Sequence, residues 1–332
     1  MIRRARATAP VRLDFAGGWT DVPPFSTREG GVVVGAAIQL RAEAEVVPGG
    51  RGLRLVAEDL GQTVELAGHE ELATDCGLPL LRAALRLAPP SGPLTLRTHS
   101  AAPAGSGLGS SGAIDVALVA ALAAAHGAAP TPREIADAAC RLEAEEAKIP
   151  GGRQDQFVAA YGGFTLLRFR DPEVDVVPLR PSDAFTSELA RRTILCYTGA
   201  SRFSGSTIAR VMQGYERGEP GIVGALQSLR CLAEQMVDAL QREDLARVGA
   251  LMADNWREQQ SLDAGMCTPV MAQLDAALGN AGALGGKAAG SGAGGCMFFI
   301  AGDDVAAARR AAAEAGAQLL PVEWSWDGVR TW

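Results

Sequence analysis

Histidine is scarce in this chain, and its cysteines follow no ligand spacing. The 332 residues include three histidines and six cysteines, with no Cys-x-x-Cys pair and no histidine at ligand spacing from a cysteine. These absences argue against a zinc site and against a histidine-based triad. We expect reduced, mostly buried thiols in a cytoplasmic protein. The cysteines are Cys76, Cys140, Cys196, Cys231, Cys267 and Cys296.

Lysine is rarer still, with only Lys148 and Lys287. Each lies beside a glycine-rich turn, so Schiff-base or pyridoxal chemistry has little support. The net charge of −7 and the lack of any Lys/Arg block argue against nucleic acid or an anionic membrane as the main partner. A small phosphorylated ligand stays compatible with this charge, because it needs only a local cluster of donors.

Long apolar runs are missing as well. Residues 1–15 are basic and lack the apolar core of a signal peptide. The longest uncharged stretch, 116–132, contains a histidine and two prolines, and is too short and too broken to span a bilayer. No repeat of roughly 20–50 residues is visible. The length therefore predicts about two globular domains, or one large one.

Hydrophobic periodicity predicts an α+β chain whose second half is mainly helical. Strands are expected at 11–15, 32–38, 42–47, 53–57, 63–66, 94–99, 164–169, 193–197, 297–300 and 319–324. Helices are expected at 113–126, 133–148, 206–217, 223–241, 244–260 and 304–316. Thr131 and Glu134 form a capping-box pattern before the second helix. The segment 171–183, rich in Pro and Asp, is the expected boundary between domains at 1–180 and 184–332.

Three glycine-rich segments lie at 16–21, 105–112 and 285–295. A P-loop does not fit, because Ala288 follows Lys287 where a hydroxyl must reach magnesium. The dinucleotide spacing G-x-G-x-x-G occurs at 107–112 and again at 290–295. The first copy lacks a second parallel strand with an acidic residue about 20 residues on, and the second copy leads into a strand.

Residues 103–113, P-A-G-S-G-L-G-S-S-G-A, have the composition of a loop that binds phosphate. Their small side chains leave backbone N–H groups free to close on phosphate oxygens, and the loop opens a helix whose positive end faces the same anion. Ser110 and Ser111 add hydroxyl donors and a hard oxygen ligand suited to magnesium. The alternative is a flexible Gly/Ser connection.

This loop resembles the P-x-G-x-G-L-G-S-S-x-A motif of the GHMP kinases, which include galactokinase, homoserine kinase, mevalonate kinase and phosphomevalonate kinase. Residues 10–21 resemble the first motif of that family and 290–295 the third, in the same order. The resemblance therefore covers the whole chain. It implies a two-domain α+β fold, in which an N-terminal domain like ribosomal protein S5 domain 2 and a C-terminal ferredoxin-like domain enclose the active site.

Two more stretches resemble one particular group within the GHMP kinases. Residues 151–164, with G-G-R-Q-D-Q-F and Y-G-G-F, and residues 197–202, Y-T-G-A-S-R, look like D-glycero-D-manno-heptose 7-phosphate kinases. Two residues depart from that pattern. Trp19 stands where those kinases more often have Gly and fucokinases have Trp, and Cys296 stands where a further Gly is usual.

The resemblance implies ATP-dependent phosphorylation of the anomeric C1 hydroxyl of D-glycero-α-D-manno-heptose 7-phosphate, giving the 1,7-bisphosphate for nucleotide-heptose synthesis. ATP and Mg²⁺ are the implied co-substrate and metal, and a small sugar or sugar phosphate is the implied partner. Two alternatives stay open: an anomeric kinase for an unphosphorylated sugar such as L-fucose, and a non-catalytic sugar or ATP sensor. The oligomeric state is open as well, a homodimer included.

The resemblance also assigns roles in the chemistry. Asp155 matches the catalytic base, and Arg12 matches the cation that stabilises both the base and the γ-phosphoryl group. The alternatives are a surface aspartate on a turn and a strand arginine that faces solvent. Ser111 and Glu143 match the magnesium ligands, with Glu145 as a rival for Glu143.

The remaining assignments concern the two substrates. The implied sugar-binding residues are Gly18, Trp19, Thr20 and Asp21; Trp19 either stacks on the sugar or is a buried aromatic. Three cations that cannot be ranked from the sequence are candidates for a substrate phosphate, although each is otherwise an ordinary surface charge: Arg153, Arg202 and Lys287. The implied ATP-binding residues are Pro103, Gly105, Ser106, Gly107, Leu108, Gly109, Ser110, Ser111, Gly292 and Gly294.

Overall fold

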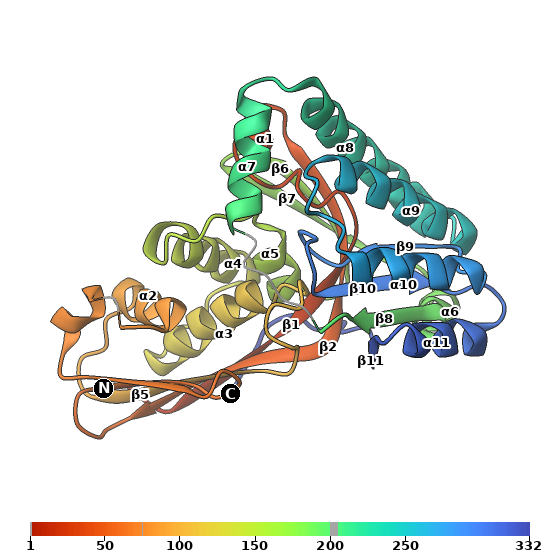
Figure 1. Cartoon of the computed structure of the whole chain (residues 1–332). Helices are drawn as coiled ribbons and strands as arrows, with labels where there is room; N and C mark the ends of the chain where they lie inside the picture. The colour runs from red at the N-terminus through yellow and green to blue at the C-terminus, as the bar shows by residue number, and fades with distance from the viewer. Residues whose placement is uncertain (1, 75, 200–204) are drawn as a thin grey trace.

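The structure, a computed structural model, describes residues 2–74, 76–199 and 205–332 and contains two β-sheets with helices packed on them (Figure 1). The larger sheet has eight strands, with β12-β1-β2-β5-β3-β4 in one row and β6 and β7 added beside β2. The smaller sheet has four strands in the order β11-β8-β10-β9. The predicted α+β class is confirmed.

Two long antiparallel strands form the spine of the larger sheet. β1 (Ala5–Ala16) pairs along most of β2 (Gly31–Pro48). The start of β2 pairs with β6 (Phe164–Arg170), and its end pairs with β5 (Leu94–Ser100). The sequence predicted two strands where β2 is one, and the gap between them falls at a register shift opposite Pro10 and Val11. A bulge of this kind bends a strand without ending its pairing.

Helices cover one face of this sheet. α3 (Ser110–Ala125) is apolar almost all round, as a helix buried between a sheet and other helices must be. It packs on β1 and β2 and contacts α4 (Pro132–Arg141) and α5 (Gln154–Tyr161). The remaining elements of this part are α1 (Phe25–Arg28), β3 (Leu53–Ala57), β4 (Gln62–Leu66), a 3₁₀ turn (His69–Ala73) and α2 (Pro79–Leu87).

The capping box predicted before α4 is confirmed. The Thr131 hydroxyl accepts a hydrogen bond from the Glu134 amide, and the Glu134 carboxylate accepts one from the Thr131 amide. The helix is shorter than the predicted 133–148. It ends at Arg141 and passes into one π-helical turn (Leu142–Glu146), which changes the direction of the side chains that follow.

The smaller sheet carries the rest of the chain. Its strands are β8 (Thr193–Tyr197), β9 (Gly285–Ala288), β10 (Cys296–Ile300) and β11 (Gln318–Leu320). Its helices are α6 (Asp183–Arg192), α7 (Gly205–Glu216), α8 (Pro220–Gln241), α9 (Leu245–Ser261), α10 (Pro269–Asn280) and α11 (Val305–Glu314). α8 and α9 lie side by side (Figure 1). α8 contacts β1 and β2, and α9 contacts β1 and β9, so this pair joins the two sheets.

Two segments differ from the expected domain division. Most of the supposed linker 171–183 is β7 (Glu173–Leu179), which forms a hairpin with β6 in the larger sheet. The last residues of the second domain expected at 184–332 belong to the larger sheet instead, because β12 (Arg330–Thr331) pairs with β1. Trp324 bridges to Ile38 of β2, and its ring centroid lies 4.8 Å from that of Phe164. Burial of this aromatic side chain holds the C-terminal segment on the first sheet.

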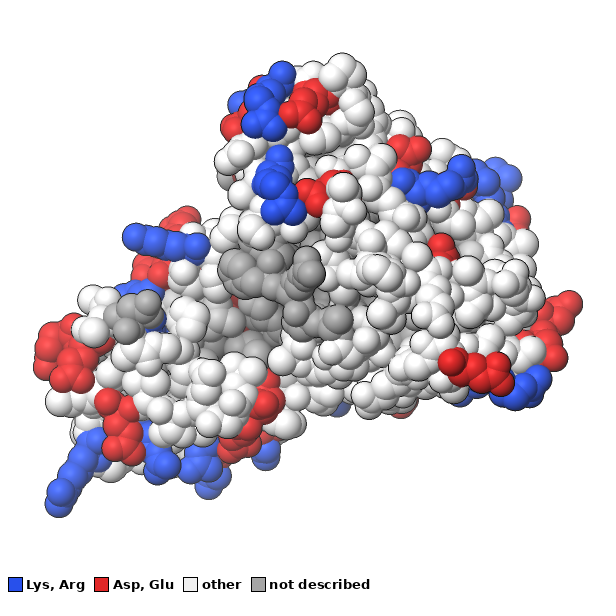
Figure 2. All heavy atoms as spheres, viewed as in Figure 1, with Lys and Arg blue, Asp and Glu red and all other residues white. Residues whose placement is uncertain are grey.

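No helix in the described ranges is both long enough and apolar enough to cross a membrane. On the face shown in Figure 2, acidic and basic side chains are interspersed around the edge of the molecule.

Candidate active site

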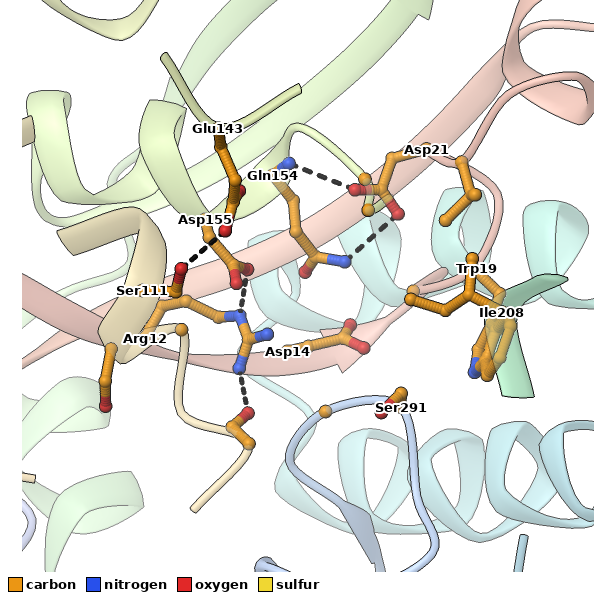
Figure 3. Close-up of a pocket in the computed structure, with 18 of the residues that line it drawn as sticks. Arg12, Asp14, Trp19, Asp21, Ser111, Glu143, Gln154, Asp155, Ile208 and Ser291 are labelled. Carbon is orange, nitrogen blue, oxygen red and sulfur yellow. Dashed lines mark hydrogen bonds and ion pairs between the residues drawn. The ribbon is translucent and has the colours of Figure 1, made fainter. Parts of the chain in front are cut away.

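A cleft of about 490 Å³ lies where the three glycine-rich segments meet (Figure 3). Its walls come from the end of β1 and the turn after it, the loop before α3, the turn before α5, and the loop between β9 and β10. Segments that are far apart in the sequence therefore enclose one space. This is the meeting of motifs that the sequence predicted.

The loop before α3 has the backbone of an anion site. Gly105, Gly107 and Gly109 all have positive φ, which side-chain-bearing residues rarely adopt, and Gly109 is the N-cap of α3. The loop and the first turn of the helix line the cleft, so the free N–H groups of the helix N-terminus open toward it. A negatively charged phosphate is the kind of ligand that such a terminus favours.

Some of the expected ATP-binding residues lie behind this surface. Leu108 is fully buried, and its carbonyl accepts a hydrogen bond from the Arg12 amide, so it anchors the loop. Pro103 does not line the cleft, and in the third segment Gly290 and Ser291 line it instead of Gly292 and Gly294. A Cβ on Gly292 would come 2.6 Å from the Met266 sulfur, so this glycine is needed for packing.

Arg12 ties the segments together from the middle of the cleft. Its Nε donates to Asp155 Oδ1 at 2.8 Å, and its Nη1 donates to the carbonyls of Gly107 at 2.6 Å and Ala289 at 2.7 Å. The Arg12 side chain is only 6% exposed. The alternative of a solvent-facing arginine is therefore excluded, and Asp155 faces a buried, fixed cation.

Asp155 lies in the first turn of α5 and approaches the N-terminus of α3 closely. A Cβ on Gly109 would lie 3.0 Å from the Asp155 Cγ, and a Cβ on Gly112 would lie 2.6 Å from its Cβ. The glycines before and inside α3 therefore let the carboxylate reach the region where a phosphate would bind. Asp155 lines the cleft, as the sequence predicted for a base.

The two glutamines beside Asp155 each hold another acid. Gln154 donates from its amide N–H and its Nε2 to the two carboxylate oxygens of Asp21, at 3.0 and 3.1 Å. Gln156 Nε2 donates to Glu143 Oε2 at 2.5 Å. The Q-D-Q sequence thus positions three carboxylates at once. Neither glutamine was among the predicted site residues, although both stand in the stretch that carried the resemblance.

Ser111 and Glu143, the two residues predicted to bind magnesium, lie together in the structure. Ser111 Oγ donates to Glu143 Oε1 at 2.5 Å, and both residues line the cleft (Figure 3). Burial raises the pKa of Glu143 to about 7, and the Asp155 charge adds to that rise. Glu145, on the same π turn, is exposed and lies outside the cleft. The geometry favours Glu143 over its rival.

A metal would fit this pair only with help from the nucleotide. The described residues contain no group of three or more His, Cys, Asp or Glu side chains that could hold a metal ion. Two hard oxygens beside a phosphate-binding loop match the habits of Mg²⁺, which keeps several waters and binds jointly to substrate phosphates.

The turn after β1 supplies the expected sugar side. Asp21 lines the cleft, and burial raises its pKa to about 6, with the charges of Asp155 and Asp14 adding to the rise. Thr20 is fully buried and does not line the cleft. Its hydroxyl donates to the Gly17 carbonyl and accepts from the Val32 amide. It therefore holds the turn in place.

Trp19 sits at positive φ and is 5% exposed. It belongs to an apolar cluster with Val22 and Phe25, and it lines the cleft beside Ile208 of α7 (Figure 3). Its indole N–H has no hydrogen-bond partner among residues 2–74, 76–199 and 205–332. Trp19 is therefore mostly buried and also lines the cleft, and stacking on the sugar stays a prediction.

The cations expected to bind a substrate phosphate do not face the cleft where they are described. Lys287 is fully buried, and its Nζ donates to the Asp14 carbonyl, Asp14 Oδ2 and the Ala288 carbonyl, which use all three of its protons. Arg153 turns away to pair with Asp171 and to donate to the Pro172 carbonyl. Arg202 lies outside the described residues. The expectation is therefore wrong for Lys287, and in this structure Arg153 is not placed for that role.

Two acidic residues in or near the site were not among the predicted site residues. Asp14 lines the cleft two residues after Arg12 on β1, a spacing that puts both side chains on one face of the strand. Asp115 is the one charge in the otherwise apolar α3, and it is fully buried. Burial raises its pKa well above the usual range, and the charges of Glu143 and Asp155 act in the same direction.

Comparison with known proteins identifies the same family as the glycine-rich motifs did. Residues 75–163 match the GHMP kinases N terminal domain, and residues 236–318 match the GHMP kinases C terminal domain. A mevalonate kinase of Thermococcus sibiricus is 30% identical, with 98% of each chain covered.

Sugar kinases are also similar to this chain. The D-glycero-alpha-D-manno-heptose 7-phosphate kinase of Campylobacter jejuni is 29% identical over 90% of each chain. The L-fucokinase/L-fucose-1-P guanylyltransferase of Bacteroides fragilis is 28% identical over 91% of this chain, which covers 35% of that longer protein. Among solved structures, a D-glycero-D-manno-heptose 1-phosphate kinase of Bacteroides thetaiotaomicron superposes with a TM-score of 0.81, at 24% identity and over 99% of this chain and 98% of that one.

The raised pKa of Asp21 predicts a pH-dependent gain of stability in Asp21→Asn. A carboxyl whose pKa is raised by folding stabilises the fold fully below pH 4, and that stability is lost as the pH rises through about 6. The neutral variant should therefore gain roughly 2–3 kcal/mol relative to the wild type between pH 4.5 and pH 8. Thermal melting at both values, without ligands, measures this gain.

Asp21→Asn also loses an acceptor for Gln154, and this lowers the stability of the variant by the same amount at both pH values. The loss therefore cancels when the two melting differences are compared. Asp263→Asn is the control, because Arg210 lowers the pKa of Asp263 and its carboxylate is ionised at both pH values, so its melting difference from the wild type should stay nearly constant. A melting difference between Asp21→Asn and the wild type that stays the same at both pH values would contradict the assignment.

Proposed function

This chain belongs to the GHMP kinase family, and on that premise we propose that it phosphorylates the anomeric C1 hydroxyl of D-glycero-α-D-manno-heptose 7-phosphate with ATP. The product is the 1,7-bisphosphate, an intermediate for nucleotide-heptose synthesis. The observation that carries the proposal is the ion pair between the buried Arg12 guanidinium and Asp155. It lies at the junction of the three glycine-rich segments, opposite the N-terminus of α3.

The pair provides what transfer to a hydroxyl requires. Phosphoryl transfer depends on positioning and on neutralising charge, and it needs little covalent chemistry from the protein. Asp155 accepts the proton of the attacking C1 hydroxyl, while the new bond forms to the γ-phosphorus and the bond to the leaving ADP oxygen breaks. Arg12 fixes the direction of the base through its hydrogen bond to Oδ1, and it adds positive charge beside the transferring group.

The other residues divide between the two substrates. The loop before α3 binds the ATP phosphates through backbone N–H groups. Ser111 and Glu143 would hold Mg²⁺, which supplies charge neutralisation on the phosphate oxygens when bound. Asp21, fixed by Gln154, binds sugar hydroxyls, and Trp19 with Ile208 forms the apolar wall of the sugar side.

The heptose phosphate is supported by the Campylobacter jejuni relative and by the Q-D-Q stretch, whose glutamines hold Asp21 and Glu143. One observation favours the alternative, an unphosphorylated sugar such as L-fucose. Within the described part of the cleft lining, the only cation is Arg12, and its contacts to Asp155, Gly107 and Ala289 are already made.

A substrate panel tests the proposal. ATP consumption is measured against hexoses, heptoses and their 6- or 7-phosphates, and D-glycero-D-manno-heptose 7-phosphate should give the highest kcat/KM. A higher value for L-fucose than for any phosphorylated sugar would establish the alternative. No ATP turnover with any acceptor would instead favour the sensor.

Asp155→Asn should lower kcat by about 100-fold or more, because the amide cannot accept the hydroxyl proton. The KM for ATP should change little, since the carboxylate does not hold the nucleotide. Steady-state kinetics with the best acceptor of the panel provides both values. Asp171→Asn, whose carboxylate lies outside the cleft, is the matched control. Near-normal kcat in Asp155→Asn would refute its role as the base.

Glu143→Gln should raise the Mg²⁺ concentration for half-maximal rate by roughly 10-fold or more, because one hard anionic ligand becomes neutral. Ser111→Ala should act in the same direction. Glu145→Gln is the control, because this exposed side chain on the same turn should leave the Mg²⁺ titration unchanged. The reverse result, with an effect only in Glu145→Gln, would assign the metal to the rival residue.

A further inference from the structure

Asp14 and Lys287 form a fully buried ion pair beneath the cleft. Lys287 Nζ lies 2.9 Å from Asp14 Oδ2 and 2.7 Å from the Asp14 carbonyl oxygen, and the Lys287 side chain has no exposed surface. Asp14 is 2% exposed and still lines the cleft. A lysine that donates all three protons this way fixes both the backbone and the carboxylate of Asp14.

The second oxygen of this carboxylate has no donor. Asp14 Oδ1 is buried, and within the described structure no group donates a hydrogen bond to it. A buried carboxylate oxygen without a partner is costly, so such an atom in a native protein needs an explanation. Lys287 binds the other oxygen and no described residue donates to this one, so Oδ1 can accept a hydrogen bond from a molecule bound in the cleft.

The carboxylate is placed on the sugar side of the reacting groups. In Figure 3 it projects into the space between Gln154 and Ser291, between Arg12 on one side and Trp19 on the other. Gly18 keeps this space open. A Cβ there would lie 2.1 Å from Asp14 Oδ2 and 3.5 Å from Gln154 Nε2.

The strand geometry explains how Asp14 reaches this position. Register shifts in the β1–β2 pairing occur between Pro10 and Val11 and between Asp14 and Ala16. They flank the segment that carries Arg12 and Asp14. Bulges beside active sites redirect side chains in this way.

We propose that Asp14 Oδ1 accepts a hydrogen bond from a second hydroxyl of the acceptor, one that is not phosphorylated, and that Lys287 is the positioning residue for this contact. The inference rests on the proposed function in one respect, that the acceptor is a sugar or a sugar phosphate. A site built to accept from a hydroxyl rejects an analogue that lacks it, because the buried carboxylate is then left unpaired. Asp14 would thus determine specificity without taking part in phosphoryl transfer.

The test uses the full chain and whichever acceptor the panel finds best, together with its monodeoxy and monodeoxyfluoro analogues at each non-reacting position. In the wild type, one position should be distinguished, with kcat/KM about 100-fold lower for the deoxy analogue. The fluoro analogue at that position should be equally poor, because fluorine cannot donate a hydrogen bond. In Asp14→Asn, parent and deoxy acceptor should differ less than about 5-fold, while the KM for ATP stays nearly constant.

Asp14→Asn also leaves Lys287 as an unpaired buried charge, so a second variant controls for that effect. Asp14→Asn/Lys287→Met removes both charges together, which is tolerated far better than leaving one unpaired. It should show the same loss of discrimination between parent and deoxy acceptor. Lys287→Met alone should raise the KM for the acceptor more than it lowers kcat, as a positioning role requires.

The outcomes separate this inference from the proposed function. If another sugar replaces the heptose phosphate as best acceptor, the proposed function fails and the Asp14 test proceeds unchanged. If the Asp14 variants reduce kcat/KM for the parent and for every deoxy analogue by one common factor, Asp14 is only structural and the inference is overturned. A panel in which no sugar is bound or phosphorylated overturns both.

Discussion

The hydrogen bonds of Arg12 are the interaction on which the site depends. One buried guanidinium joins the strand β1, the loop before α3, the end of β9 and the first turn of α5. A planar group with fixed donors can meet acceptors from several segments only when all of them are in place. The correct docking of the two sheets is therefore also the condition that orients Asp155. Folding and catalytic geometry share this contact.

The charge balance of the cleft follows from that arrangement. Asp14, Asp21, Glu143 and Asp155 all line the cleft, while Arg12 is the one cation described among the residues lining it. Burial raises the pKa of Asp21 and of Glu143, so both carboxylates are held at a cost to the empty fold. Donors brought by a bound acceptor, and a cation brought with a nucleotide, would offset that cost. Such a site is more stable when filled than when empty.

The sequence predicted the parts of the site whose signal is local. Glycine spacing predicted a phosphate-binding loop and the Q-D-Q stretch predicted Asp155, and the structure places both at the cleft. Close approach of backbone restricts the residue type at such positions. The sequence could not show where a cation points. Lys287 lies beside a glycine-rich turn and was therefore a candidate to bind a substrate phosphate. The pairing of β9 with β10 buries it against Asp14 instead. Non-local pairing likewise turned a Pro- and Asp-rich linker into β7 and returned the C-terminus to β1. Neither of these two pairings produces a hydrophobic period in the sequence around it, so local patterns could not predict them.

The two sides of the cleft are built from different materials, and this difference bears on how specificity changes. The side proposed for the nucleotide consists mostly of backbone and glycines, where a Cβ on Gly109 or Gly112 would meet Asp155 and one on Gly290 would meet the Gly107 carbonyl. The side proposed for the sugar consists of side chains on one strand and its turn, namely Asp14, Trp19 and Asp21. Under that proposal, a substitution there would alter which hydroxyls are bound and leave the contacts of Arg12 intact. One phosphoryl-transfer geometry can therefore serve different acceptors through changes in a few residues after Arg12.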